Sequence, residues 1–169
     1  TDALAAVRAL NAKGITASLD LLGESVTRED EARATAREYV ELLDRIAAER
    51  LDANVSVKLT ALGLDVSDEV CLASAHEVLQ RARRHGTFVR LDMEGSAYTE
   101  RTISLVETLW SEGYRNVGTV LQSYLRRTRD DIHRMPRHFR IAPLQLPLST
   151  QPQADREPGA HQERSECNS

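Results

Sequence analysis

Hydrophobic residues follow two alternating spacings along the first three quarters of the chain. Apolar positions three and four residues apart predict amphipathic helices, whereas short runs rich in β-branched residues predict strands. The predicted helices cover about residues 3–13, 28–49, 68–85 and 98–112, with a further one beginning in 126–135, and the predicted strands cover 15–22, 54–63, 88–93 and 117–124. Strands separated by helices can pair in parallel, because no tight turn has to join them. The order therefore predicts an α/β fold with a parallel sheet.

Polar and glycine residues mark the expected ends of these helices. Thr27 precedes the second predicted helix and is expected to cap it through its hydroxyl. Asp65 or Ser67 is expected to cap the third helix, and Gly86, which tolerates positive φ, is expected to end it.

Polar positions within the strands favour a barrel over a doubly wound sheet. Doubly wound nucleotide-binding sheets usually carry a GxGxxG or GxxxxGK[ST] motif after a strand, and the eight glycines form neither. In a barrel one face of each strand meets the helices, which is where Met93 is expected, and the other face fills the interior. The inward polar residues near the carboxyl ends of the four strands are Asp20, Lys58, Asp92 and Gln122. The sequence therefore predicts a partial (β/α) barrel of about four βα units with chemistry at that end.

Lys58 differs in kind from the other basic residues. The chain has 22 lysine and arginine residues, of which only Lys13 and Lys58 are lysines. Neighbouring strands lie about 4.8 Å apart, so the ammonium of Lys58 is expected between the carboxylates of Asp20 and Asp92. A lysine between two carboxylates is typical of an active site and also of a structural ion pair at a barrel rim. Gln122 has an alternative too, because a buried amide is often hydrogen-bonded to the backbone.

An aldolase-type Schiff-base enzyme is a second interpretation of Lys58. A desolvated lysine can act as a nucleophile toward a carbonyl. Flanking carboxylates raise the pKa of a lysine and keep it protonated, which disfavours that chemistry.

Composition limits the classes of protein that remain. The chain has 169 residues, 41% hydrophobic and 28% charged, which fits one globular domain. No apolar run reaches the roughly 18 residues of a membrane-spanning helix, and the N-terminus lacks the basic-then-apolar pattern of a signal peptide, so we expect a cytoplasmic protein. A net charge of −4 argues against nucleic acid as a partner. Cys71 and Cys167 have neither disulfide-scaffold nor metal-site spacing, so no metal is expected, and a start at Thr1 indicates a processed or partial sequence.

A change in composition divides the chain into residues 1–131 and 132–169. All five prolines lie in the second part, which has no periodic pattern beyond a short apolar stretch at 141–148. We therefore expect 1–131 to form the barrel segment and 132–169 to be a mostly disordered tail.

Four phrases carry a resemblance to a known family. They are LDLLGES at 19–25, SVKLTALGLDVS at 56–67, VRLDMEGS at 89–96 and VGTVLQSYLRRT at 117–128. Together and in this order they are similar to the first half of the bacterial proline dehydrogenase family. The resemblance implies a distorted (β/α)8 barrel that binds FAD and oxidises L-proline to Δ1-pyrroline-5-carboxylate by hydride transfer to the flavin. It also implies a membrane quinone as the electron acceptor, and with it a peripheral association with the inner membrane.

The same resemblance assigns roles to five residues. Lys58 resembles the lysine that binds the substrate carboxylate, and Asp92 resembles an active-site aspartate that orients the substrate. Met93 and Gln122 match positions that contact the flavin. Glu24 resembles an acid that closes the site by pairing with an arginine from the far side of the barrel.

The resemblance stops near residue 131. The family continues into a VRLVKGAY-like fifth strand and a paired-arginine helix, and residues 132–169 match neither. A shifted reading frame or a shortened gene would produce such a tail. Half a barrel leaves open sheet edges that invite self-association. We therefore expect a truncated proline dehydrogenase that is inactive alone, with a non-catalytic, self-associating half-barrel as the alternative.

Overall fold

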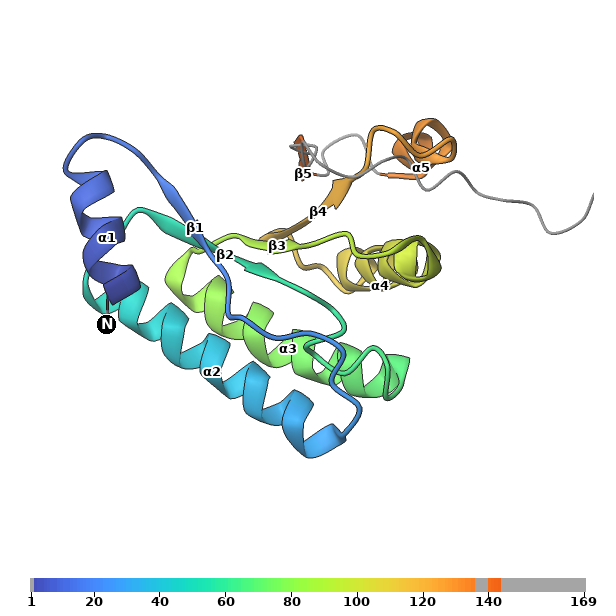
Figure 1. Ribbon diagram of the computed structural model, residues 1–169, viewed down its shortest axis with the longest axis horizontal. Coiled ribbons are helices and arrows are strands. Elements are labelled where there is room, and N and C mark those ends of the chain that lie inside the picture. Colours follow the sequence, from blue (N-terminus) through green and yellow to red (C-terminus); the bar gives the residue numbers. More distant parts are fainter. Residues whose placement is uncertain (1, 136–139, 144–169) are drawn as a thin grey trace, which may run out of the picture.

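A computed structural model describes residues 2–135 and 140–143 (Figure 1). Helices and strands alternate along the chain, as the hydrophobic pattern predicts. The helices are α1 (Asp2–Asn11), α2 (Glu29–Ala48), α3 (Asp68–His85), the 3-10 helix η1 (Ser96–Tyr98), α4 (Thr99–Ser111) and α5 (Thr128–Arg134). The strands are β1 (Ala17–Leu19), β2 (Ala53–Val57), β3 (Val89–Leu91), β4 (Val117–Leu121) and β5 (Arg140–Pro143).

The five strands form one parallel sheet in the order β1-β2-β3-β4-β5. Each strand pairs with its neighbour in sequence, and α2, α3 and α4 lie on the same side of the sheet (Figure 1). A doubly wound sheet reverses its strand order at a switch point, whereas a barrel adds each strand beside the last one. The described strands therefore form a sector of a (β/α) barrel, and the predicted fold class is confirmed.

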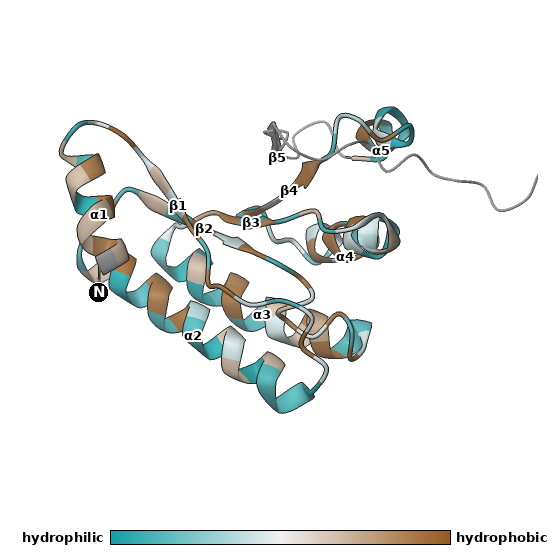
Figure 2. Cartoon of the chain, viewed as in Figure 1, coloured by the Kyte–Doolittle hydropathy of each residue, from teal (hydrophilic) through white to brown (hydrophobic). Residues whose placement is uncertain are grey.

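The hydrophobic core lies between the sheet and the helices α2, α3 and α4 (Figure 2). Alternate residues of β2, namely Val55 and Val57, point into it with no exposed surface. Tyr39 of α2 is also buried, and its hydroxyl donates to the carbonyl of Ser56 at 3.0 Å and accepts from the N–H of Leu21 at 3.2 Å. Burial raises the pKa of Tyr39 to about 12, so the hydroxyl stays neutral and joins α2 to the ends of β1 and β2.

Close packing continues in the loop that follows β2. Gly63 has φ 94°, and a Cβ there would lie 2.9 Å from the Ala32 Cβ and 2.9 Å from the Val70 Cγ1. Only glycine fits that position, which holds the loop tightly against α2 and α3.

The helix ends confirm one predicted cap and correct another. Ser67 caps α3, because its hydroxyl accepts from the N–H of Val70 at 3.1 Å, and Gly86 ends that helix with φ 68°. The prediction that Thr27 caps α2 is wrong. Arg28 is the N-cap residue and makes no side-chain cap; its guanidinium instead binds the carboxylate of Asp30. Acidic residues in the first turn of α2 stabilise the positive end of the helix dipole, although no hydroxyl caps the helix.

The boundary expected at residue 131 falls inside a structured region. Residue 131 lies within α5, and β5 pairs in parallel with β4, Gly118 opposite Arg140. The segment 132–169, expected to be mostly disordered, thus includes a strand at its apolar stretch. Residues 136–139 and 144–169 lie outside the described residues, as does the predicted tail that they form. In the described part of the chain, no helix has the length and apolar character required to cross a bilayer.

Candidate active site

A cleft of about 930 Å³ opens over the carboxyl ends of β1, β2, β3 and β4. Each of the first three strands, together with the residue that follows it, places two residues in the wall, spaced by two positions. These pairs are Ser18 and Asp20, Ser56 and Lys58, and Arg90 and Asp92. Because side chains alternate between the faces of a strand, this spacing is what a barrel interior requires. Three of the four predicted inward residues, Asp20, Lys58 and Asp92, therefore meet in one cleft.

A directed set of hydrogen bonds holds Asp92. The Arg90 side chain donates from Nε to the Ser56 hydroxyl at 3.2 Å and from Nη2 to the Ser18 hydroxyl at 2.5 Å. Ser56 donates to Asp92 Oδ1 at 2.5 Å. A guanidinium can only donate, so the single proton of the Ser56 hydroxyl has to point to Asp92. The arrangement fixes Asp92 Oδ1 toward Ser56 of β2.

Lys58 binds a different carboxylate from those expected. Its Nζ lies 2.7 Å from Glu24 Oε2, which comes from the loop after β1. The Glu24 carboxylate raises the pKa of Lys58, with smaller contributions from Glu94 and Asp20, and Lys58 in turn lowers the pKa of Glu24. The expected position between Asp20 and Asp92 is therefore corrected: the longer Glu24 side chain reaches the ammonium, and Arg90 and Ser56 engage Asp92.

The raised pKa of Lys58 also bears on the Schiff-base interpretation. A lysine must lose its proton to attack a carbonyl, and the neighbouring carboxylates stabilise the charged form. The site favours ionic binding by Lys58 over nucleophilic attack.

The two residues expected at a flavin, Met93 and Gln122, take different positions. The alternation predicts that Met93 faces the helices, but Met93 lines the cleft and also packs against the edge of the core. The strand ends at Leu91, so the two-residue alternation no longer applies at Met93. Gln122 follows β4 and is not among the residues that line the cleft; its backbone carbonyl accepts from the Thr128 hydroxyl. Val120, two positions earlier, occupies the inward place on β4.

Sequence reasoning missed Glu94 as a cleft residue. Its carboxylate accepts from the Thr60 N–H at 3.1 Å and from the Thr60 hydroxyl at 2.5 Å, which joins the loops after β2 and β3. Its place directly after the LDM phrase could have indicated a cleft residue, but Glu94 lies beyond the strand, where the alternation does not apply. With Asp20, Glu24 and Asp92, the described part of the cleft holds four carboxylates against the two cations Lys58 and Arg90. An amine with a carboxylate matches both the excess negative charge and the ammonium of Lys58.

A family model described as proline dehydrogenase matches residues 3–140. The chain belongs to the proline dehydrogenase family. It is 37% identical to Proline dehydrogenase 1 of Bacillus subtilis subsp. natto over 133 residues, which is 79% of this chain and 44% of that protein. It is 35% identical to Proline dehydrogenase of Deinococcus radiodurans, also over 133 residues, 76% of this chain and 43% of that protein. The chain thus spans less than half the length of the curated relatives it matches.

Solved structures agree with this family assignment. One is proline utilization A from Bdellovibrio bacteriovorus inactivated by N-propargylglycine, with a TM-score of 0.68 and 28% identity. The match covers 78% of this chain and 17% of that protein. Proline utilization A from Corynebacterium freiburgense gives a TM-score of 0.61 and 29% identity, and the match covers 74% of this chain and 14% of that protein. The family resemblance of the four sequence phrases is confirmed.

Proposed function

We propose that this chain forms the amino-terminal half of the active-site barrel of an enzyme that oxidises L-proline to Δ1-pyrroline-5-carboxylate. The observation that carries the proposal is the cleft at the carboxyl ends of the strands, where Lys58 and Asp92 meet in a chain of this family. In the reaction, proline loses a hydride from Cδ and a proton from its nitrogen, which leaves a C=N bond in the ring.

Each of the two residues has a role that its surroundings support. Lys58 is protonated and binds the carboxylate of L-proline, a charge-assisted contact that fixes the orientation of the ring. Asp92 is fixed through Oδ1 by Ser56, so Oδ2 is the oxygen proposed to accept a hydrogen bond from the proline nitrogen. Substrate held at both ends keeps its reacting carbon in a constant place.

FAD is the proposed cofactor, and the described residues fit one end of it. Met93 and Val120 make part of the cleft wall apolar, which suits a planar ring, and Gln122 is proposed to approach it when the barrel is complete. When bound, FAD supplies the acceptor for the hydride. Within residues 2–135 and 140–143, both cations of the cleft already have partners, Lys58 with Glu24 and Arg90 with two serines. We therefore expect the diphosphate to be held by residues beyond this set, and the isolated 169-residue chain to bind FAD weakly and to lack turnover.

The proposed partners follow from the same family. We propose a quinone as the electron acceptor and a cytoplasmic protein with peripheral attachment to the inner membrane. Self-association of the isolated chain is supported by β1, which pairs only with β2 among the described strands and so leaves an edge. The non-catalytic half-barrel remains the alternative that this edge favours.

A chimeric enzyme tests the proposal. Residues 3–140 replace the matching segment of Proline dehydrogenase 1 of Bacillus subtilis subsp. natto, so that the missing half is supplied. We expect a yellow protein whose flavin absorbance is bleached by L-proline, and an Asp92→Asn chimera that stays yellow but bleaches far more slowly. A yellow chimera that L-proline does not bleach would contradict the proposal. If the chimera binds no flavin, binding of L-proline to the 169-residue chain, compared with its Asp92→Asn variant by nuclear magnetic resonance, decides the question.

A further inference from the structure

The Arg90 side chain crosses three neighbouring strands on the inward face of the sheet. Arg90 lies opposite Ser56 in the parallel pairing of β3 with β2, and its guanidinium extends as far as Ser18 of β1. The interior of a barrel is usually filled by branched apolar side chains. An arginine at this level therefore requires a specific explanation, and Arg90 is not among the five residues to which the family resemblance assigns a role.

The guanidinium of Arg90 binds neutral hydroxyls rather than a carboxylate. Nε donates to Ser56 at 3.2 Å and Nη2 donates to Ser18 at 2.5 Å. Among the described residues, Asp92 supplies the one carboxylate within ion-pair distance, with Oδ1 3.7 Å from Nε, which is too long for a hydrogen bond. Ser56 fills this gap, because it accepts from Nε and donates to Oδ1 at 2.5 Å. Arg90 thus reaches Asp92 through Ser56.

The direction of the Ser56 hydroxyl depends on Arg90. A serine hydroxyl has one proton and rotates freely, so without a fixed donor beside it the proton can turn to water or to another acceptor. The Nε–H of Arg90 occupies the acceptor side of Ser56 and leaves the proton for Asp92. Ser18 holds the far end of the guanidinium, and the planar fork then keeps Nε in place. Loss of Arg90 should therefore loosen Asp92, although the two side chains are too far apart to bond directly.

We propose that Arg90 is a positioning residue, which fixes the Asp92 carboxylate through Ser56 and keeps Oδ2 directed into the cleft. The inference rests on the proposed function in taking L-proline as the substrate whose nitrogen Oδ2 contacts. A group that contacts substrate has to be held within a fraction of an ångström, and a small displacement costs much of the rate. Arg90 then affects the oxidation of L-proline only through Asp92.

Two neutral substitutions of Arg90 separate its hydrogen bond from its charge. Arg90→Met and Arg90→Gln remove the same charge and leave side chains of similar size, but only glutamine has an N–H at the position along the side chain where arginine has Nε. Arg33→Met is the control, since it removes the same charge from an exposed ion pair with Glu29. In the 169-residue chain, the 13C signal of the Asp92 carboxyl reports the contact, and its loss in Asp92→Asn identifies it.

The carboxyl signal tests the positioning without any substrate. We expect Ser56→Ala and Arg90→Met to move the Asp92 signal, Arg90→Gln to move it much less, and Arg33→Met to leave it unchanged. An unmoved signal in Arg90→Met, or equal shifts in Arg90→Met and Arg90→Gln, would overturn the inference. If Arg90→Met does not fold, Ser56→Ala takes its place in the comparison with Arg90→Gln, under the same criterion.

The chimeric enzyme then tests the effect on the reaction. The rate at which L-proline bleaches the flavin should fall about tenfold in Ser56→Ala and in Arg90→Met, the factor that one hydrogen bond with a charged partner is worth. In an Asp92→Asn chimera the same substitutions should lower the rate no further. Equal losses in both backgrounds would show a merely structural role and would overturn the inference. If the carboxyl signal responds as expected and the wild-type chimera does not oxidise L-proline, the proposed substrate is wrong while the positioning of Asp92 stands.

Discussion

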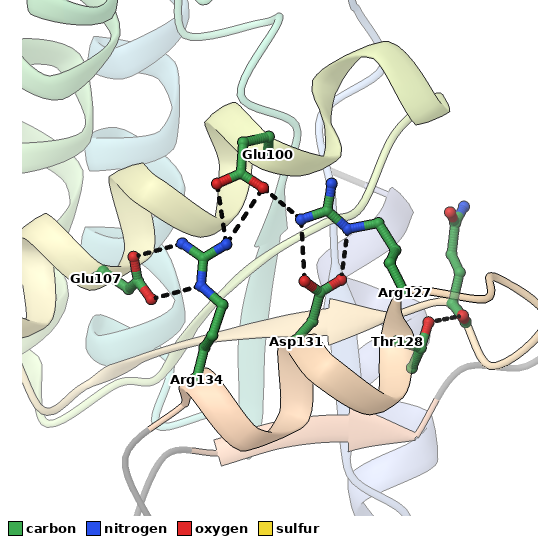
Figure 3. Close-up of polar contacts among 7 residues, drawn as sticks. Glu100, Glu107, Arg127, Thr128, Asp131 and Arg134 are labelled. Carbon is green, nitrogen blue, oxygen red and sulfur yellow. Dashed lines mark hydrogen bonds and ion pairs between the residues drawn. The ribbon is translucent and has the colours of Figure 1, made fainter.

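The helices at the two ends of the sheet are held by different forces. On the side of β1 to β3, α2 and α3 bury apolar residues against the strands, and Tyr39, Leu43 and Ile46 of α2 have at most 2% exposed surface. On the side of β4 and β5, α5 buries only Asp131 within its bounds. Figure 3 shows what fixes that helix: its charged side chains bind those of α4. α4, which precedes β4, is also held by apolar packing, through residues such as Ile103 and Leu109. The comparison teaches that α2, α3 and α4 are packed on the sheet, whereas α5 is clamped by ions.

The clamp is a connected network of three acids and two arginines. Arg127 donates to both oxygens of Asp131, at 2.8 and 2.9 Å, and also binds Glu100 (Figure 3). Arg134 binds Glu100 at 2.9 Å and Glu107 at 3.0 Å. Asp131 is only 4% exposed, whereas the other four side chains are each at least 36% exposed. Screening by solvent makes most of this network weak, and the buried Asp131 contact is its strongest part.

The largest expected effect is a loss of packing on the apolar side. Leu43→Ala leaves a cavity at a fully buried position and should lower the free energy of unfolding by about 3 kcal/mol. Chemical denaturation measures the change. Leu22→Ala removes the same atoms from a side chain that is 98% exposed, and it should leave the stability nearly unchanged. Equal losses for the two variants would contradict the assignment of the core.

A smaller and more local loss is expected on the ionic side. Asp131→Asn keeps the size of the side chain but removes the charge that holds Arg127, at a cost of about 2 kcal/mol. Hydrogen exchange should rise in α5 and β5 and stay constant in α2 and α3. Asp130→Asn, at an exposed position on the same helix, is the control. Faster exchange in α2 as well would show that the two sides unfold together.

Acid should weaken the ionic clamp of α5. Hydrogen bonds from Arg127, and then from Arg134, lower the pKa of Glu100 below its ordinary value of 4.5. Because the folded-state pKa is depressed, the stabilisation is complete above the ordinary pKa and is lost as the pH falls through the lower folded value. We expect the protection of the α5 amides, their exchange rate relative to the unfolded chain at the same pH, to fall over that range in the wild type. A Glu100→Gln chain should show high exchange in α5 already at neutral pH, and an unchanged wild-type profile with acid would contradict the clamp.

The smallest effect concerns a helix end on the apolar side. Ser67→Ala removes the cap of α3 and should cost about 1 kcal/mol. Thr27→Ala, at a position that the sequence also suggested as a cap, should cost nothing measurable, because Thr27 does not cap α2. A loss for Thr27→Ala that equals the loss for Ser67→Ala would contradict the assigned α2 start.

The packed side was predictable from the sequence, and the ion pairs were not. Periodic apolar positions identified α2, α3 and the buried face of β2, since burial repeats with the geometry of the element. The alternation along β1 to β3 placed Asp20, Lys58 and Asp92 in one cleft. It failed where the strands end: Met93 turned into the cleft, Glu24 reached Lys58 from a loop, and no periodic pattern applies there. Long side chains such as that of Arg90 also have several possible partners within reach, and the sequence does not show which of them they bind.

The most direct test of the account concerns Lys58 as the receptor for the carboxylate of L-proline. In the chimeric enzyme, kcat/KM is measured for L-proline and for pyrrolidine with Lys58→Met and, as control, Lys13→Met. We predict that Lys58→Met lowers kcat/KM for L-proline by at least tenfold, about 1.4 kcal/mol, and leaves oxidation of pyrrolidine unchanged, while Lys13→Met changes neither. An equal loss with both substrates, or no loss with L-proline, would contradict the assignment of Lys58 as the carboxylate receptor.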